Sequence, residues 1–118
     1  MRYIYMITCQ MWGGYGVKIG YAKDFQRFAA YYTHNPTAKL HQTLTVYPKT
    51  KHRLERQLHR EMALLGYRRI QAEDGRTTEW FFVPYGKAQS FLAQGFTQFK
   101  VCQKRKVTHY INGKAVHS

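Results

Sequence analysis

The sequence predicts an α+β fold, because stretches with the two-residue periodicity of strands alternate along the chain with stretches of helical periodicity. The β-branched and aromatic segment Arg2–Cys9 is followed by the glycine-rich stretch 13–16 and a second apolar alternation at Val17–Gly20, which together predict a β-hairpin. The clearest helix is Pro48–Gly66, where leucines and a methionine recur at spacings of four, four and three. These two observations decide the fold class.

The remaining elements follow in chain order. Lys23–Tyr32 has the composition of a short helix, and His34–Pro36 ends it because the residue before a proline avoids the helical region. A third strand is expected near Leu40–Tyr47, and Arg68–Thr78 is predicted to be a loop. The C-terminal part is expected to hold a short apolar element at Glu79–Val83, a helix at Gly86–Ala93 closed by Gly95, and a hairpin-type turn at Asn112–Gly113.

The charge of the chain favours a polyanionic partner. Its 118 residues suit one domain, and Lys and Arg outnumber Asp and Glu by 19 to 6, which gives a net charge of +13. Such a charge gives nucleic acid a salt-dependent, sequence-independent affinity through counterion release. A ribosomal protein, a chromatin-like binder or a binder of anionic membranes would share this charge. We do not expect a membrane partner, because the sequence lacks a long apolar run and a basic amphipathic helix with a lipid-like face.

The first residues and the cysteines bear on the location of the protein. Met1–Ile7 is apolar but lacks the charged leader and cleavage site of a signal peptide. Cys9 and Cys102 form no CxxC pair and suggest neither a zinc site nor a disulfide framework, so we interpret them as ordinary thiols. We therefore expect an intracellular, cytoplasmic protein.

Short motifs in the right order resemble one nuclease family. The triplet Tyr3–Tyr5 occupies the place of a GIY triplet and Lys18–Gly20 the place of a YIG triplet, and Thr33–Pro36, Leu54–His59 and Glu79–Phe81 follow in order. Over residues 2 to 83 the chain resembles the GIY-YIG nuclease superfamily, in particular its phage and bacterial branch with a Lys-Ile-Gly second triplet and a Glu-Trp-Phe segment.

The resemblance implies a small central three-stranded antiparallel sheet flanked by helices, and hydrolysis of a phosphodiester bond with one divalent cation, Mg²⁺ or Mn²⁺. It places a nuclease domain at residues 1–95. Residues 96–118 would then be a basic C-terminal extension, with a hairpin packed on the same domain as one arrangement.

Glu55 is the expected metal ligand. Hard cations require carboxylate oxygens, and only six carboxylates exist in the chain. Glu55 alone of these lies on the strongest predicted helix beside its apolar stripe, where the resembled family holds its metal. The alternative is a solvated side chain that pairs with His59 or Arg56. His59, four residues on, would contact the phosphate, orient Glu55, or serve a structural role.

The resemblance also suggests residues that manage the water and the phosphate. Tyr5 would contact the phosphate or orient the water, and a structural aromatic is the alternative. Lys18 stands where many relatives carry a second tyrosine; a lysine holds a phosphate as a point charge, so we favour that role and keep Tyr21 as an alternative phenol. Arg27 would stabilise developing charge, although it lies one position before the expected arginine and about 100° away around a helix.

Further residues are candidates for contact with nucleic acid. His34 and Asn35 would shape the rim of the groove, or merely form the turn that ends a helix. Lys104, Arg105 and Lys106 suit contact with a nucleic-acid backbone, with a solvated charge run as the alternative. Glu79 is expected to be structural rather than a second metal ligand.

The function predicted from the sequence is a Mg²⁺- or Mn²⁺-dependent endonuclease acting on DNA, with double-stranded DNA as the expected partner. The main alternative is a non-catalytic nucleic-acid-binding module on the same fold, to which the displaced Arg27 and the lysine at position 18 would point. An RNA-associated structural protein is a third class. The oligomeric state stays open, with a dimer as one alternative.

Overall fold

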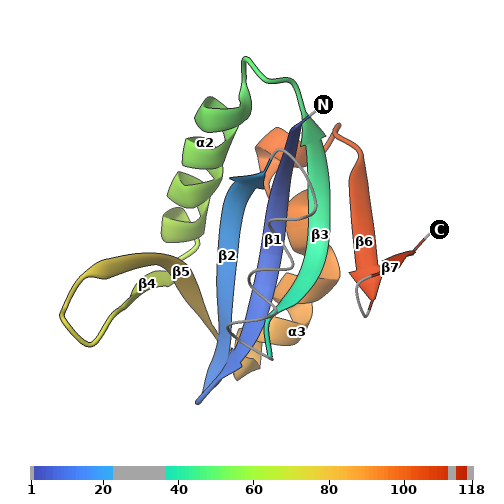
Figure 1. Ribbon diagram of the computed structural model, residues 1–118. Helices are drawn as coiled ribbons and strands as arrows, with labels where there is room; N and C mark the ends of the chain where they lie inside the picture. The colour runs from blue at the N-terminus through green and yellow to red at the C-terminus, as the bar shows by residue number, and fades with distance from the viewer. Residues whose placement is uncertain (1, 23–36, 112–113, 117–118) are drawn as a thin grey trace.

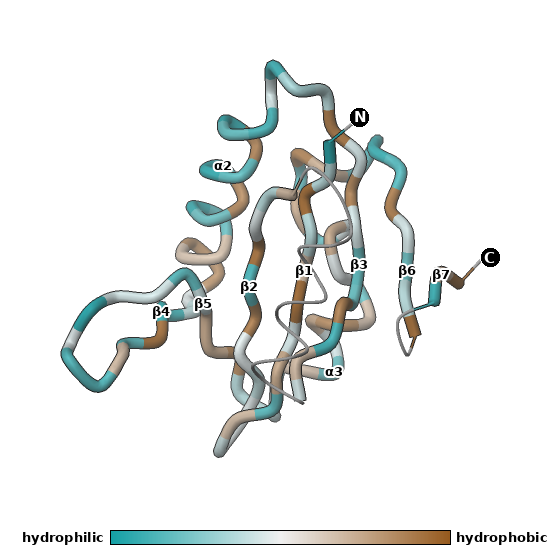
Figure 2. Tube along the Cα trace, viewed as in Figure 1, coloured by the Kyte–Doolittle hydropathy of each residue, from teal (hydrophilic) through white to brown (hydrophobic). Residues whose placement is uncertain are grey.

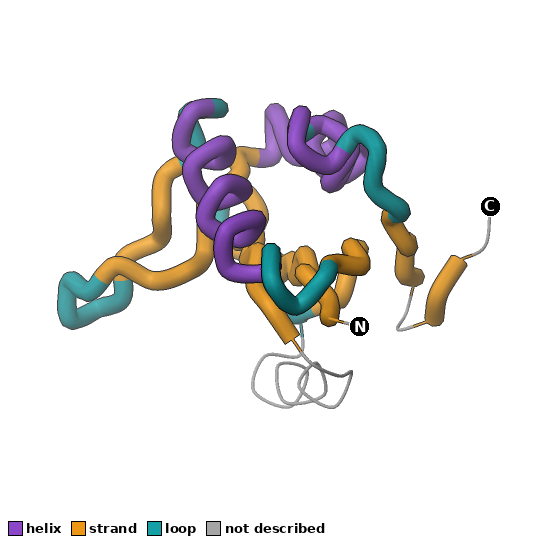
Figure 3. The backbone as a smooth tube through the Cα atoms, turned by 90° about the horizontal axis from the view of Figure 1, so that it is seen from above, coloured by secondary structure: helices purple, strands orange, loops and turns teal. Residues whose placement is uncertain are grey.

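The computed structural model describes residues 2–22, 37–111 and 114–116. The helix expected at Lys23–Tyr32 and the turn at His34–Pro36 lie outside these residues, and so does Arg27. The described strands form one sheet, and two α-helices lie on the same side of it (Figure 1, Figure 3). The elements are β1 (Arg2–Met11), β2 (Gly14–Ala22), β3 (Lys39–Val46), α2 (Lys51–Leu64), β4 (Arg68–Gln71), β5 (Thr77–Pro84), α3 (Tyr85–Gln94), the short 3₁₀ turns η1 (Gly95–Gln98) and η2 (Lys100–Cys102), β6 (Val107–Ile111) and β7 (Lys114–Val116).

The sheet is antiparallel throughout, in the order β4-β5-β2-β1-β3-β6-β7. The hairpin predicted at its centre is confirmed: β1 and β2 pair from Tyr3 opposite Ala22 to Met11 opposite Gly14. The third predicted strand is confirmed as β3, which pairs with the other edge of β1 and shifts register between Met6 and Ile7. These three long strands form the middle of the sheet.

The expected three-stranded sheet flanked by helices is wrong, because the described residues form a sheet of seven strands. Strand β4, at Arg68–Gln71, falls in the predicted loop: two arginines and a glutamine leave it without apolar alternation, yet such residues are common on an edge strand that faces solvent. Strand β5 extends the predicted apolar element and pairs with β2. Strands β6 and β7 extend the opposite side of the sheet beyond β3.

The larger core lies between the sheet and the two helices. The helical spacing on α2 is confirmed for Leu54, Leu58 and Met62, which are buried there, but not for Leu65, which follows the helix and is 48 % exposed. The three buried residues pack with apolar residues of β1, β2, β3 and β5, and with Phe91 of α3. Hydrophilic residues occupy much of the rest of α2 (Figure 2). The chain leaves the helix at Gly66, whose φ of 92° suits glycine.

The opposite face of the sheet carries a second, smaller apolar cluster. Because side chains alternate along a strand, Tyr5, Ile7 and Cys9 of β1 point to this face while Ile4 and Met6 point to the helices. The cluster continues through Ala22, Ala38 and Leu40, with Met11, Trp80 and Tyr110 packed against it. Trp80 and Phe81, neighbours on β5, therefore serve opposite faces.

A buried glutamine ties the C-terminal strands to the sheet. The side chain of Gln42 on β3 is fully buried; its Oε1 accepts a hydrogen bond from the Phe96 backbone N–H at 2.7 Å. Its Nε2 donates to Nδ1 of His109 on β6 at 3.1 Å. The segment after Gly95 is thus fastened to the same sheet by a polar contact that an apolar side chain cannot make.

The two cysteines are free and buried, as expected of ordinary thiols. Burial raises the pKa of Cys9, and it raises the pKa of Cys102 to about 12. In the described ranges, neither helix is long and apolar enough to cross a bilayer.

Candidate active site

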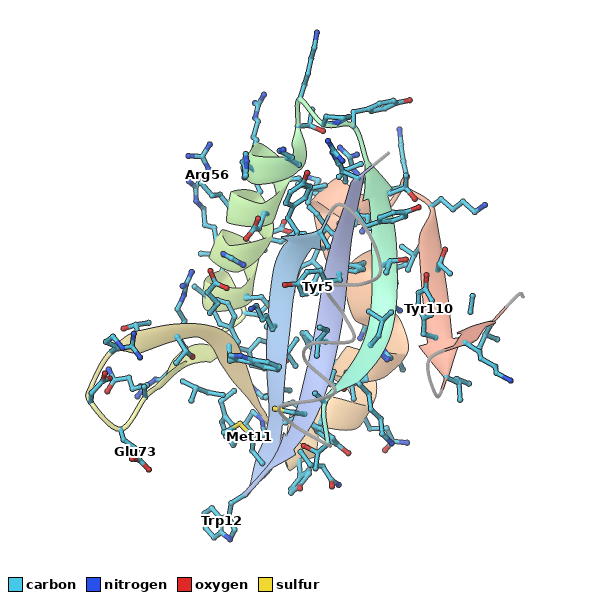
Figure 4. All side chains as sticks on the ribbon, viewed as in Figure 1. Tyr5, Met11, Trp12, Arg56, Glu73 and Tyr110 are labelled. Atoms are coloured by element: carbon cyan, nitrogen blue, oxygen red, sulfur yellow. The ribbon has the colours of Figure 1, made fainter. Side chains whose placement is uncertain are left out.

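Tyr5 lies across the central hairpin. It is opposite Gly20 in the β1–β2 register and is only 2 % exposed. A Cβ atom built at Gly20 would overlap the Tyr5 hydroxyl and ring carbons, so the ring passes directly over the backbone of β2 at that point. Figure 4 shows Tyr5 in the middle of the sheet. The absence of a side chain at position 20 therefore sets where the phenol hydroxyl lies.

Helix α2 presents three polar residues to the same stretch of β2. Lys51, Glu55 and His59 are spaced by four and so share one side of the helix. Lys51 Nζ donates to the Tyr21 hydroxyl at 3.1 Å, and His59 Nε2 lies 2.7 Å from the Ile19 carbonyl oxygen. Lys51, one turn before Glu55, bonds Tyr21, and His59, one turn after it, bonds Ile19. Glu55 therefore faces the stretch of β2 at Gly20.

Glu55 and Tyr5 both lie beside the Gly20 stretch of β2, where β2 has left its pairing with β5, although Tyr5 lies on the face of the sheet opposite to α2. Glu55 is half-buried, and its side chain makes no hydrogen bond or ion pair within the part of the chain that the structure describes. A partly exposed carboxylate without these partners has both oxygens available to bind a ligand. This arrangement is the reason for placing a candidate active site at Gly20.

The hydrogen bonds of His59 give it a role in placing α2. A carbonyl oxygen can only accept, so Nε2 carries the proton that bonds Ile19. The other ring nitrogen, Nδ1, lies 3.5 Å from an Arg69 nitrogen, and the ring packs against Phe81 at 5.9 Å between centroids. Both ring nitrogens thus face groups of the fold, which matches the structural alternative for His59 better than contact with a phosphate.

Tyr21 lies at the Lys51 end of this row. The Lys51 ammonium is 4.5 Å from the centre of its ring as well as hydrogen-bonded to its hydroxyl, and His52 lies beside the ring at 5.7 Å. A cation over an aromatic face and a donor on its hydroxyl together hold the phenol in place. Tyr21 is thus available as a positioned hydroxyl next to a positive charge.

Lys18 lies on the same face of the sheet as Tyr5, two residues from Gly20 along β2. Its ammonium is 3.3 Å from a carboxylate oxygen of Glu79, and the two side chains are 13 % and 62 % exposed. A phosphate held by Lys18 would have to share the ammonium with Glu79 or displace it. Because Glu79 is largely exposed, we expect that ion pair to be weak and readily exchanged.

Basic side chains border the site on two elements. Arg53, Arg56 and Arg60 are exposed on the outer side of α2, and Arg56 points away from the sheet (Figure 4). The β4–β5 hairpin projects beside α2 (Figure 1) and adds the exposed Arg68 and Arg69. We call these five arginines the arginine border. It offers backbone contacts to a nucleic-acid strand that passes Glu55.

The other predicted residues are not brought to this site by the described structure. Arg27, His34 and Asn35 lie outside the described residues. Lys104 and Lys106 are exposed in the link between η2 and β6, and the half-buried Arg105 donates its Nε to the Val101 carbonyl at 3.3 Å. Since β6 lies on the far side of β3 from β2, this basic cluster belongs to another part of the surface.

The residues at the site fit a hydrated hard cation rather than a closed metal cage. Across residues 2–22, 37–111 and 114–116 there is no group of three or more His, Cys, Asp or Glu side chains that would enclose a metal. Mg²⁺, however, usually keeps several waters and takes one or two carboxylates plus substrate phosphate oxygens. A single accessible carboxylate, Glu55, meets that requirement.

The comparison with protein families decides the membership of the chain. The model of the T5orf172 domain matches residues 2–95, which is more than half of the chain and includes every residue of the candidate site. The chain belongs to the T5orf172 domain family. No curated protein and no solved structure matches it significantly.

Membership in the T5orf172 family overturns the resemblance to the GIY-YIG superfamily. The triplets Tyr3–Tyr5 and Lys18–Gly20 are short, and alternating apolar and polar residues with a glycine at a crossing point are what this β-hairpin needs for packing alone. The T5orf172 family is associated with nuclease-like and DNA-binding functions, and a role on nucleic acid is compatible with it.

Sequence reasoning missed two residues of this T5orf172 domain that shape the site. Lys51 holds Tyr21, and Arg69 reaches His59 while its guanidinium lies over the Phe81 ring at 5.1 Å. The spacing of Lys51, Glu55 and His59 was a usable signal, because residues four apart on a helix share a face. Arg69 gave no such signal, since its segment was predicted to be a loop.

Proposed function

We propose that this chain is a divalent-cation-dependent endonuclease that hydrolyses phosphodiester bonds in DNA, with Glu55 as its protein ligand for Mg²⁺ or Mn²⁺. The observation that carries the proposal is the position of Glu55 on α2, between Lys51 and His59, which both bond β2, with no hydrogen bond or ion pair to its carboxylate among the described residues. Family membership and the net charge of +13 support nucleic acid as the substrate class.

A cation held by Glu55 would neutralise charge on the scissile phosphate. The Tyr21 hydroxyl, held by Lys51 of α2, can donate to a phosphate oxygen or accept from the attacking water, which fixes the direction of its approach. Tyr5 would take the same role from the other face of the sheet, where its side chain is 2 % exposed. Lys18 and Lys51 add positive charge on either side of Gly20 and stabilise the charge that develops on the phosphate. His59 keeps α2, and hence Glu55, at its distance from β2.

The arginine border supports DNA passage along α2. Its five guanidinium groups are exposed and lie on the elements that flank Glu55. Arginine binds phosphate through a planar fork of donors, which suits contact with a nucleic-acid backbone. We expect these contacts to be independent of base sequence and to weaken with added salt.

The test is cleavage of supercoiled plasmid in Mg²⁺, in Mn²⁺ and in EDTA by the wild type and by Glu55→Gln. The matched control is Glu73→Gln, which makes the same change of charge at an exposed position in the β4–β5 loop. We expect cleavage by the wild type and the control only with metal. Glu55→Gln should lose at least the roughly 10- to 100-fold that loss of an outer-shell metal partner costs.

DNA binding distinguishes the nuclease from the non-catalytic nucleic-acid-binding module. Fluorescence anisotropy in EDTA should show similar affinities for the wild type, Glu55→Gln and Glu73→Gln, because neither substitution removes a basic group. If all three bind DNA but none cleaves DNA or RNA in either metal, the chain is a nucleic-acid-binding module and the nuclease proposal is wrong.

A further inference from the structure

We propose that Trp12, at the tip of the β1–β2 hairpin, is a stacking platform for an unpaired nucleic-acid base. Its side chain is 98 % exposed, the most exposed of the large hydrophobic residues described. Figure 4 shows it at the end of the hairpin, pointing away from the body of the protein. The inference rests on the proposed function for the identity of the partner, and it adds a substrate class, DNA with unpaired bases.

The tip that carries Trp12 is held in place. Strands β1 and β2 pair up to Met11 opposite Gly14, so only two residues form the turn. The first residue of α3 braces it: the Tyr85 N–H donates to the Gly13 carbonyl at 3.1 Å, and the Tyr85 hydroxyl donates to the Met11 carbonyl at 3.1 Å. A braced turn holds the indole at a fixed position and lowers the entropy lost on binding.

The fold itself gives no reason for a tryptophan at this position. Two-residue hairpin turns favour Asn, Asp and Gly, and here Gly13, with φ of 85°, already supplies the special backbone conformation. An indole normally contributes stability through the large apolar area that it buries, and Trp12 buries almost none. The indole of Trp12 therefore has both faces open to an external partner.

A nucleic-acid base is the partner that the surroundings favour. Every base has a flat face, and aromatic side chains bind bases in sequence-independent recognition of single strands. The long-range charge of +13 draws polyanions to the chain, while the exposed rings at the tip, Trp12 and Tyr85, make a smaller apolar surface than a protein interface or a bilayer needs. Stacked bases in a duplex hide their faces, so the base must be unpaired.

The distance along β2 sets where that base lies relative to the cut. Six residues separate Gly20 from Gly14, and at about 3.3 Å per residue this corresponds to roughly 20 Å. A strand in duplex DNA rises about 3.4 Å per nucleotide and an extended single strand rises more, so about six nucleotides or fewer span this distance to the scissile phosphate. The preferred substrate is thus a junction, flap or gap with single-stranded DNA on one side of the cleavage point.

The experiment uses the full chain in EDTA, so that binding is measured apart from cleavage. In a Trp80→Phe background, Trp12 is the only tryptophan, and its emission is followed during titration with a single-stranded oligonucleotide and with a blunt duplex of the same length. Affinities are measured for Trp12→Ala, Trp12→Phe and, as a control, Tyr47→Ala. Tyr47 is 71 % exposed and follows β3 at the opposite end of the sheet.

We expect single-stranded DNA to quench Trp12 and the duplex to leave its emission nearly unchanged. Trp12→Ala should weaken single-strand binding by about 5- to 100-fold, the range that stacking on one base provides, and Trp12→Phe should recover part of the loss. Tyr47→Ala should have no effect. Because Trp12 makes few contacts, its variants should unfold at the wild-type temperature.

Three results would overturn the inference: unchanged emission at saturating single-stranded DNA, equal affinities of wild type and Trp12→Ala, or an emission change caused by protein concentration or anionic phosphatidylglycerol vesicles instead of DNA. Quenching without any cleavage by the wild type would keep the stacking platform and remove the nuclease. Cleavage without quenching would keep the nuclease and remove the stacking platform.

Discussion

Replacing Gly20 by alanine should damage the candidate site by moving Tyr5. A Cβ at this position would lie 3.0 Å from Tyr5 Cε2 and closer still to Cζ and the hydroxyl, whereas carbon atoms pack at about 3.5–4.0 Å. The obstacle is a ring that is itself 2 % exposed and packed in the second apolar cluster, so it has little room to withdraw. The strain must be shared by the ring and by the backbone of β2.

Overpacking of this kind typically costs about 1–3 kcal/mol. For a domain of this size, roughly 4 °C of melting temperature is lost per kcal/mol, so we expect Tm to fall by about 4–12 °C. Because Tyr5 would no longer hold its hydroxyl at the same place, cleavage should fall by about 100-fold, the loss typical of a misplacement near 1 Å. DNA affinity should change little, since no basic group is removed.

Calorimetric melting, plasmid cleavage and a double-mutant cycle with Tyr5→Leu test this reasoning. Gly86→Ala is the control, because nothing lies within 4 Å of a Cβ at that helical position. In the Tyr5→Leu background the ring is gone, so Gly20→Ala should cost much less stability than in the wild type. An equal cost in both backgrounds would show that the Tyr5 ring does not lie over Gly20.

Three further predictions concern buried polar groups. Gln42→Leu leaves the Phe96 N–H without its acceptor and should lower the free energy of unfolding by about 1–3 kcal/mol, measured by urea titration. If Gln42→Leu lowers that free energy no more than His109→Ala does, the prediction is contradicted. Burial lowers the pKa of His41 below its ordinary 6.5, so the unfolded chain binds the proton more readily than the folded chain. The free energy of unfolding should therefore fall as the pH drops below 6.5, and His41→Gln should reduce this dependence on pH. A pKa near 12 keeps the Cys102 thiol protonated, so a thiol reagent should modify it only on unfolding, and rapid native-state labelling would refute this.

The central elements could be predicted from sequence because their signals are local. The β1–β2 hairpin shows strand alternation around glycines, and α2 shows its apolar stripe at Leu54, Leu58 and Met62. Each pattern arises because one face of the element is buried, so it can be recognised without knowledge of the rest of the fold.

The outer strands could not be predicted from local sequence patterns in the same way. Edge strand β4 is held by hydrogen bonds to β5 and presents arginines to solvent, so no apolar periodicity marks it. Strand β6 depends on the buried Gln42, a contact between residues far apart in sequence. The number of strands is therefore a property of long-range pairing, and the expectation of three strands could not be corrected from composition.

The sequence named candidate site residues but not their contacts. Tyr5 was chosen through the resemblance to the GIY-YIG superfamily, and Glu55 through the same resemblance together with its helix and the scarcity of carboxylates. That Tyr5 crosses Gly20, and that His59 bonds the Ile19 carbonyl, depends on how α2 docks against β2. The family itself was misjudged because short triplets report hairpin geometry, whereas the T5orf172 match draws on 2–95 together.

The most direct test of the central claim is to locate Mn²⁺ by anomalous scattering in a crystal of the chain with DNA. We expect one peak within coordination distance of a Glu55 oxygen, on the side facing β2, and no peak at Glu55→Gln. Manganese bound only at other carboxylates, such as Glu73 or Asp74, with no density at Glu55, would contradict the assignment of Glu55 as the metal ligand.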